Sequence, residues 1–442
     1  MTAPPTGTAQ ATVRARAPRP VSLRAQWFHE RIGTSLWFTP LLFVLGAVVV
    51  SRGLAWIDQS YPAARRTPFL LGIDPSDGAV LTSTVATAML TFIAVVFSTT
   101  LVAVQVAASQ YSPRIVRLFV RSRVTHVTMG VFLATFVFAL NALIVSHSGG
   151  RGYVPVRTLV SVYLMVLVTL GTFVVFVHAM VRTLRVQYLL STVTGLTRPV
   201  LRHEFPGEEA YRDMPAPVDG PGVLLRCPPG TAGVVQSVDL EAIAGLAGSD
   251  GGWIDLRVRV GQYLGEGSPV AEVHGTGAPV DSHRLLAHIL TGGERTFLQD
   301  PGFGIRQLAD TAIRALSPAV NDPTTACQAV DRITDLLASV ASSPDPSGWY
   351  LGADGTVRVR RHDPTFADLC ELGFTEIIRY GADAPQVTRR LLASFALLAD
   401  LASEDHRTVL GALRRTLDDA AVEDTEAPFR DMGGRPDPLG LG

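Results

Sequence analysis

The chain has 442 residues, of which 47% are apolar and only 17% charged, and its formal net charge is −1. Soluble proteins carry about 25% charged residues, so the composition argues against an ordinary soluble enzyme. The charges are also unevenly divided: residues 1–204 contain 18 Arg and 5 acidic residues, whereas residues 205–442 contain 20 Arg and 34 acidic residues. The sequence therefore joins two physically different halves.

Every basic residue is an arginine, and this excludes chemistry that depends on a lysine amine, such as a P-loop, a Schiff base or a biotinyl group. The three cysteines, Cys227, Cys327 and Cys370, lie far apart and form no Cys-X-X-Cys pair, which argues against a disulfide framework or a cysteine zinc site. No metalloprotease or nucleophile-elbow motif is present. We therefore expect no catalytic residue, no metal and no cofactor, and we expect that the protein is not an enzyme.

The first half predicts four transmembrane helices. After a basic arm over residues 1–34, expected to be mostly disordered, four stretches are long and apolar enough to cross a bilayer, which requires about 20 residues. Together they form a predicted membrane domain over residues 35–182. The spans are expected at about residues 36–57, 80–109, 125–148 and 158–181.

Arginine placement predicts the orientation of these spans. Arginines are concentrated in the arm, in the loop between the second and third spans, and after the fourth span. The positive-inside rule therefore predicts that both termini are cytoplasmic. Anionic lipid explains these basic residues, and the second half is acidic, so nucleic-acid binding is not expected.

The second span carries a stripe of polar residues. Four of them recur every seven residues, which puts them on one side of a helix. Polar groups inside a bilayer face protein or water rather than lipid tails. Two interpretations remain open: helix packing within or between subunits, and the lining of a narrow permeation path. The stripe consists of Thr84, Thr87, Thr91, Ser98 and Gln105.

The second half begins with a helical extension over residues 183–204 and a linker over 205–222, rich in Pro, Gly and acidic residues. A small β-rich module is expected over 223–275, because apolar and polar residues alternate from Ile254 to Val260. The glycine-punctuated run that follows resembles the half-barrel of biotinyl and lipoyl carrier domains. Without a lysine, that resemblance implies only a structural use of the fold.

A helical domain with one hairpin is predicted over residues 280–422, followed by a disordered tail over 423–442. Its first helix ends at a Ser-Pro pair, and Asp322 with the following proline begins the next helix as N-cap and first residue. Charged and amide groups gather around this junction. They are Arg295, Asp300, Arg306, Asp310, Arg314, Asn321 and Asp322.

Two interpretations of these seven residues remain open. They form a binding site for a small ion or an unknown ligand, or they form a structural network of helix caps and intersubunit salt bridges. The structural interpretation is favoured, because caps and the i, i+4 ladder of Arg306, Asp310 and Arg314 already account for most of them.

Several motifs together resemble a known family. They are QYSPR at residues 110–114, RTFLQD at 295–300, FGIRQLAD at 303–310 and, most specifically, RALSPAVNDPTTA at 314–326. The chain is similar in these motifs, from about Ser35 to about Leu410, to the bacterial predicted membrane proteins catalogued as domain of unknown function 2254. The resemblance implies a bacterial plasma-membrane protein with four N-terminal spans, and it implies no activity.

The sequence thus predicts an α-helical membrane protein with a cytoplasmic α+β domain. The expected partners are the lipid bilayer and further copies of the chain, because one four-helix subunit encloses little water. The first functional hypothesis is an oligomeric channel or channel-like transporter, with a cytoplasmic domain that gates or assembles it. The alternative is a non-conducting membrane scaffold or sensor whose cytoplasmic domain binds a partner or ligand.

Overall fold

The computed structural model describes residues 37–60, 75–110, 123–148, 156–183, 185–205, 221–247, 252–275, 280–352 and 355–424. Contacts divide the described residues into a membrane unit within Trp27–Leu189 and a helix–sheet unit within Leu190–Gly442. The predicted N-terminal arm, most of the predicted linker and most of the predicted tail lie outside the described residues.

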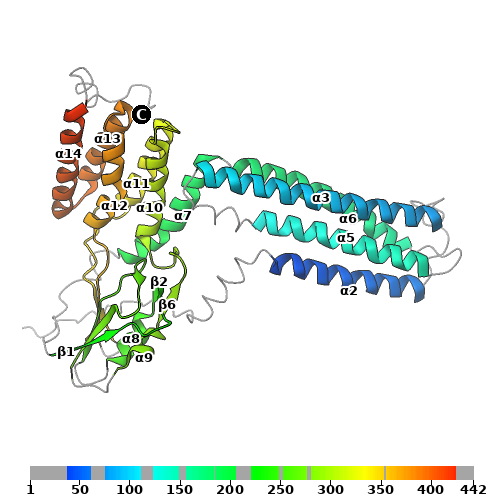
Figure 1. The fold of residues 1–442 in the computed structure, drawn as a ribbon, viewed down its shortest axis with the longest axis horizontal. Coiled ribbons are helices and arrows are strands. Elements are labelled where there is room, and N and C mark those ends of the chain that lie inside the picture. Colours follow the sequence, from blue (N-terminus) through cyan, green and yellow to red (C-terminus); the bar gives the residue numbers. More distant parts are fainter. Residues whose placement is uncertain are drawn as a thin grey trace, which may run out of the picture. The chain divides into compact units, whose positions relative to one another are not determined.

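The prediction of four apolar membrane helices is confirmed. They run side by side in the membrane unit (Figure 1) and are each longer than the span predicted from the sequence. Helices of this length and composition are able to cross a bilayer, which implies contact with lipid. The four helices are α2 (Phe38–Ser60), α3 (Pro75–Gln110), α5 (Arg123–Ser148) and α6 (Val156–Thr183).

Helix α5 forms the centre of the membrane unit, and α2, α3 and α6 all pack against it. Phe132, Phe138, Ala139 and Ala142 of α5 are completely or almost completely buried. Alanines permit close approach of neighbouring helices and the phenylalanines fill the remaining space. The interior of a single unit is therefore occupied by side chains.

Polar side chains connect α2, α5 and α6 to one another. Asn141 of α5 donates a hydrogen bond to Ser51 Oγ of α2 at 3.0 Å, and the hydroxyls of Thr135 (α5) and Thr169 (α6) lie 2.9 Å apart. Asp58, in the last turn of α2, accepts hydrogen bonds from the amide of Thr158 at 3.0 Å and from its hydroxyl at 2.8 Å. Asp58 thus satisfies an amide at the N-terminus of α6 that has no partner within its own helix.

Helix α3 is held in the unit by apolar packing. Phe92 of α3 contacts the ring edges of Phe132 (α5) and Phe173 (α6), at centroid distances of 5.9 and 5.3 Å. Val96 is fully buried in the same cluster. Among the described residues of α3, the hydroxyl hydrogen bonds all go to carbonyl oxygens of α3 itself.

The helix–sheet unit contains two sheets, so the predicted mixed helix and sheet region is confirmed, while the likeness to a half-barrel stays a prediction. The five-stranded sheet has the order β1 (Gly222–Arg226), β5 (Pro269–His274), β3 (Trp253–Leu256), β8 (Val357–Arg361), β7 (Trp349–Leu351). The three-stranded sheet has the order β4 (Tyr263–Leu264), β2 (Gly233–Val238), β6 (Ile289–Gly292).

One hydrophobic core joins the two sheets. It contains Ile254 and Leu256 of β3, Val270 of β5, Val235 of β2, and Ile243 of the short helix α8 (Leu240–Leu246). All five side chains are at most marginally exposed. Ile254 and Leu256, two residues apart in β3, both belong to this core, as expected for one face of a strand.

The hairpin β7–β8 differs from its expected place. The sequence predicts it as part of the helical domain, whereas the structure pairs β8 in parallel with β3, with Ile254 opposite Val359. The hairpin therefore completes the five-stranded sheet, and the β-rich module extends beyond the predicted residues 223–275. Parallel partners are joined by long crossover connections, which a local sequence pattern does not indicate.

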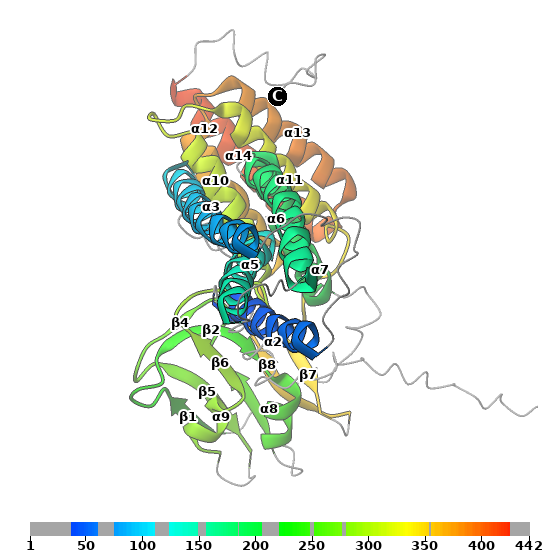
Figure 2. The ribbon, with the colours of Figure 1, turned by 90° about the vertical axis from the view of Figure 1, so that its right-hand side faces the viewer.

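The helices of this unit gather on one side of the strands, apart from the short α8 and α9 (Figure 2). Helices α10, α11, α12, α13 and α14 pack together as a bundle, and α14 reaches Asp424, two residues into the predicted tail. Their bounds, with those of α7 and α9, are α7 (Val186–Glu204), α9 (Ser282–Leu286), α10 (Pro301–Ala315), α11 (Pro323–Ala338), α12 (Phe366–Gly381), α13 (Pro385–Leu401) and α14 (Glu404–Asp424).

Candidate functional site

The polar stripe of α3 faces away from the other helices of its own unit. Thr84, Thr87, Thr91, Ser98 and Gln105 are all exposed. The residues that α3 buries, among them Ala86, Met89, Val96 and Ala103, lie on the other side of the helix, about 180° away at 3.6 residues per turn. The helices of the same unit therefore do not cover the stripe in this structure. Helix packing and the lining of a water-filled path both stay predictions.

The stripe contains two kinds of polar group. Thr84, Thr87 and Thr91 donate to carbonyl oxygens one turn earlier in α3, at 2.8, 3.0 and 3.3 Å. Within the part of the chain that the structure describes, neither the Ser98 hydroxyl nor the Gln105 amide forms a hydrogen bond. In hydrocarbon an unpaired polar group is costly, so these two side chains need a partner outside the unit.

The exposed face of α6 provides the contrast. Its exposed large side chains include Leu164, Leu167, Val168, Val174 and Val175. Such a face suits contact with lipid tails, whereas the exposed face of α3 carries hydroxyls and an amide. The exposed surface of α3 also carries large apolar side chains, among them Leu90, Leu101 and Val102, so its difference from α6 is the polar stripe that runs between them.

The seven residues singled out around the helix junction lie at three separate places in the helix–sheet unit. At the first, Arg295 donates to both carboxylate oxygens of Asp300, at 2.8 and 2.9 Å. Asp300 is 4% exposed and also caps α10 by accepting from the amide of Phe303 at 2.9 Å. Gly261, with a φ of +86°, lies against this pair, and a Cβ atom there would collide with the Asp300 carboxylate.

At the second place, Arg306 links α10 to α12. It contacts Asp310 one turn later at 2.7 Å and forms an ion pair with Glu376 of α12. The hydrogen bond with Arg306 holds the pKa of Glu376 below its usual value, and the pKa of Arg306 is raised in turn. Arg314, in the last turn of α10, is half-buried.

At the third place, Asp322 caps α11. Its carboxylate accepts from the amide of Thr325 at 3.0 Å and from its hydroxyl at 2.6 Å. Asn321 precedes it with a φ of +48°, a left-handed conformation that asparagine tolerates better than most residues. The motif Ser-Pro-Ala-Val-Asn-Asp-Pro thus matches a tight connection between α10 and α11.

Caps and ion pairs therefore account for five of the seven residues: Arg295, Asp300, Arg306, Asp310 and Asp322. Since these contacts are divided among three places, the geometry favours the structural interpretation over one common ligand site. Both interpretations stay predictions.

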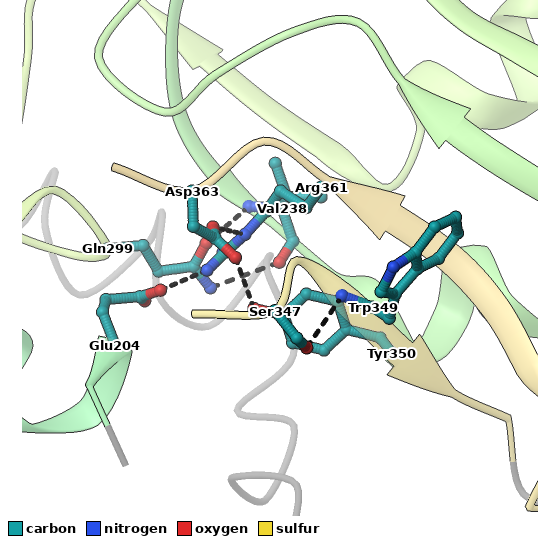
Figure 3. Close-up of polar contacts among 8 residues, drawn as sticks. All are labelled: Glu204, Val238, Gln299, Ser347, Trp349, Tyr350, Arg361 and Asp363. Atoms are coloured by element: carbon teal, nitrogen blue, oxygen red, sulfur yellow. Dashed lines mark hydrogen bonds and ion pairs between the residues drawn. The ribbon is translucent and has the colours of Figure 1, made fainter. Parts of the chain in front are cut away.

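The structure also contains a buried ionic cluster that the sequence analysis missed (Figure 3). Arg361 of β8 forms ion pairs with Glu204, the last residue of α7, and with Asp363. The side chains of these three residues are only 3–5% exposed. Tyr350 of β7 donates to Asp363 Oδ2 at 2.9 Å. We call these four residues the Arg361 cluster.

Burial dominates the acid–base chemistry of the Arg361 cluster. It raises the pKa of the Glu204 carboxyl and of the Tyr350 hydroxyl, because both lose water around their charged forms. Burial opposes the charge of Arg361, but the carboxylates of Glu204 and Asp363 outweigh it and raise the pKa of the guanidinium. Arg361 therefore stays charged.

Beside the Arg361 cluster, Gln299 extends the pairing of β2. Its side-chain oxygen accepts from the amide of Val238 at 2.9 Å, and its side-chain nitrogen donates to the Val238 carbonyl at 3.2 Å (Figure 3). The amide side chain thus replaces a strand partner at the end of β2. This explains a glutamine in the RTFLQD motif as a structural residue.

Metal and thiol chemistry receive no geometric support among the described residues. No group of three His, Cys, Asp or Glu side chains there is arranged to hold a metal ion. Cys227, Cys327 and Cys370 are buried and free. Burial raises the pKa of Cys327 to about 11 and raises that of Cys370 as well, so both remain unreactive thiols at neutral pH.

Comparison with known proteins identifies the family. Residues 33–396 match the family model described as "Predicted membrane protein (DUF2254)". The uncharacterized proteins Rv1290c of Mycobacterium tuberculosis and Mb1321c of Mycobacterium bovis are each 30% identical over 344 residues, covering 76% of this chain and 66% of each relative. The chain thus spans just under two thirds of the length of these relatives, and no solved structure matches it. The chain belongs to the DUF2254 family of predicted membrane proteins.

Proposed function

We propose that the protein is an oligomeric channel or channel-like transporter in which the polar stripe of α3 lines the path. The observation that carries this proposal is the outward direction of the stripe. A hydroxyl and an amide without partners, Ser98 and Gln105, lie on a face that the unit's own helices do not cover. Water between neighbouring copies would satisfy both groups.

The packing of the membrane unit supports a path between copies. The interior around α5 is filled by Phe132, Phe138 and small residues. A ring of copies with the α3 stripe inside and α6 outside would put the polar stripe near the axis and the apolar face of α6 in lipid. The proposal therefore includes a homo-oligomer and a small ion as the permeant species.

The proposal also places the protein in the bacterial plasma membrane and assigns it no enzymatic activity. Basic loops flank the spans on the side of both termini, which supports a bacterial plasma membrane with the termini and the helix–sheet unit in the cytoplasm. That unit would gate or assemble the oligomer, and no enzymatic activity is part of the proposal.

A second candidate is a non-conducting scaffold or sensor. Thr84, Thr87 and Thr91 already bond to their own helix, and small residues permit close helix contact, so the same face suits a dry seam between copies. The helix–sheet unit would then bind a partner or ligand.

Current through planar bilayers, measured first under voltage and then under membrane tension, separates the two. Discrete currents are expected from the purified oligomer, and Thr91→Leu combined with Ser98→Leu is expected to abolish them while assembly persists. Thr99→Leu is the matched control, because Thr99 is exposed and bonds to its own helix but lies about 100° from Ser98 around it. Silence of a folded, inserted oligomer, or loss of assembly in the double variant, contradicts the channel and favours the seam.

A further inference from the structure

Helix α7 is attached to the rest of the helix–sheet unit at three points. Thr197 lies so close to Gly304 of α10 that a Cβ atom at that position would overlap the threonine hydroxyl. Arg198 forms an ion pair with Asp335 of α11. At its C-terminal end, Glu204 forms an ion pair with Arg361 of β8. Since α7 begins three residues after the last membrane helix ends, these contacts fix the first element that follows the membrane domain.

The third attachment differs from the second in burial. Arg198 and Asp335 have side chains that are 33% and 47% exposed, whereas Glu204 and Arg361 are each 5% exposed. An exposed ion pair is screened by water and contributes little to stability. A buried pair depends strongly on whether its charges balance.

The charges of the Arg361 cluster do not balance when every group is in its ordinary state. It contains two carboxyl groups, Glu204 and Asp363, and one guanidinium, Arg361. Tyr350 supplies a neutral hydroxyl to Asp363, and His203 lies next to Glu204 on the exposed side of α7. With both carboxyl groups ionised the cluster carries one excess negative charge, and it is neutral when one carboxyl holds a proton.

We propose that Glu204 and Arg361 form a proton-controlled latch, in which protonated Glu204 keeps the last turn of α7 on the sheet and loss of that proton loosens it. Asp363 keeps its contacts with Arg361 and with the Tyr350 hydroxyl in both states. The latch acts on the connection between the membrane domain and the helix–sheet unit, and it does not depend on whether the α3 stripe lines a path.

The direction of the pH effect follows from linkage. Burial raises the pKa of Glu204 above the value that the same carboxyl has in water. The closed latch therefore binds the proton more tightly than the open latch, in which Glu204 is hydrated. Below the ordinary glutamate pKa of about 4.3, proton binding stabilises the closed latch to the full extent. This stabilisation is lost as the pH rises from that value through the raised pKa of Glu204 in the closed latch.

Hydrogen exchange of the backbone at residues 200–205, in the full chain reconstituted in lipid nanodiscs, tests the latch between pH 5 and pH 8. After correction for the chemical exchange rate, we expect protection to fall with rising pH, by about tenfold for each unit by which the Glu204 pKa is raised. Glu204→Gln copies the neutral form, so its protection is expected to be high and independent of pH.

Two control variants exclude other causes. Glu376→Gln makes the same change at the more exposed pair with Arg306, and it should leave the pH dependence at 200–205 as in the wild type. His203→Gln removes the nearby group that ordinarily titrates in this range, and it should also leave the dependence intact.

Four outcomes overturn the proposal. They are a wild-type protection that does not change with pH, a pH dependence that survives in Glu204→Gln, a dependence that disappears in His203→Gln, and a Glu204→Gln chain that fails to fold. The last outcome counts because the proposal assigns the neutral side chain to the closed state.

Discussion

Helix α3 and the other membrane helices are held in their bundle by different kinds of contact. Helices α2, α5 and α6 are joined by side-chain hydrogen bonds between helices, such as Asn141 with Ser51 and Thr135 with Thr169. Helix α3 rests on aromatic and aliphatic side chains, and it carries a polar stripe on its exposed side. Apolar packing tolerates sliding better than a directional hydrogen bond does. Of the four helices, we therefore expect α3 to depend most on contacts outside its own unit, such as another copy of the chain or water.

The largest expected effect comes from removing the aromatic support of α3. Phe132→Ala deletes a fully buried ring that contacts Phe92, at a cost of about 3 kcal/mol. We expect a clear fall in the thermal unfolding midpoint in detergent, and faster hydrogen exchange in α3 than in α6. Phe97→Ala, at an α3 side chain that is 53% exposed, is the control and should change stability by less than about 0.5 kcal/mol. Equal effects of the two variants on stability would show that α3 is not held by its buried aromatic contacts.

The next effect is expected at the connection between α2 and α6. Asp58→Ala leaves the amide of Thr158 without its acceptor and removes the carboxylate 3.5 Å from the Arg157 guanidinium. Loss of hydrogen bonds to a charged group costs about 2 kcal/mol. The thermal midpoint should fall, with exchange rising at the start of α6 and not in the middle of α3. Asp58→Asn keeps one acceptor, and its effect should be smaller.

The smallest effect is expected from a single hydrogen bond between neutral side chains. Asn141→Ala removes the bond to Ser51, and bonds of this kind in membranes contribute about 0.6 kcal/mol on average. A double-mutant cycle with Ser51→Ala measures the coupling directly. A coupling near zero would show that this hydrogen bond does not help to hold α2 against α5.

The sequence and the structure agree most closely where composition decides the outcome. Long apolar stretches predict the four membrane helices, since a bilayer permits few alternatives. The N-cap role of Asp322 also follows from local pattern, because an Asp-Pro pair is a strong helix start. In these places the neighbouring residues supply the information.

Other features depend on contacts between distant residues. The heptad spacing of Thr84, Thr91 and Ser98 predicts that they share a stripe, but not whether that stripe faces its own bundle. In the strand VRVRR at 357–361, a period of two puts Arg361 on the same face as Val357 and Val359. The alternation does not indicate what compensates a buried arginine there, because its partner Glu204 lies 157 residues away in the sequence.

Asp255 illustrates the same limit at a single position. Alternation along β3 predicts a solvent-facing carboxylate, yet Asp255 is 2% exposed. It is covered by Arg257 at 3.2 Å and by His362 at 3.0 Å. The two covering side chains directly follow β3 and β8 in the chain, and the alternation of residues along β3 does not indicate that they fold back over Asp255.

The parallel pairing of β3 with β8 determines when the five-stranded sheet is able to form during synthesis. Ile254 pairs with Val359, so β3 waits for a neighbour that leaves the ribosome roughly one hundred residues later, or about 5–20 s at ordinary rates of translation. Helices α10 and α11 emerge in this interval while one edge of β3 is still open. The sheet is therefore completed only after the first two helices of the bundle have emerged, and a chain interrupted between the two strands carries an exposed edge prone to aggregation.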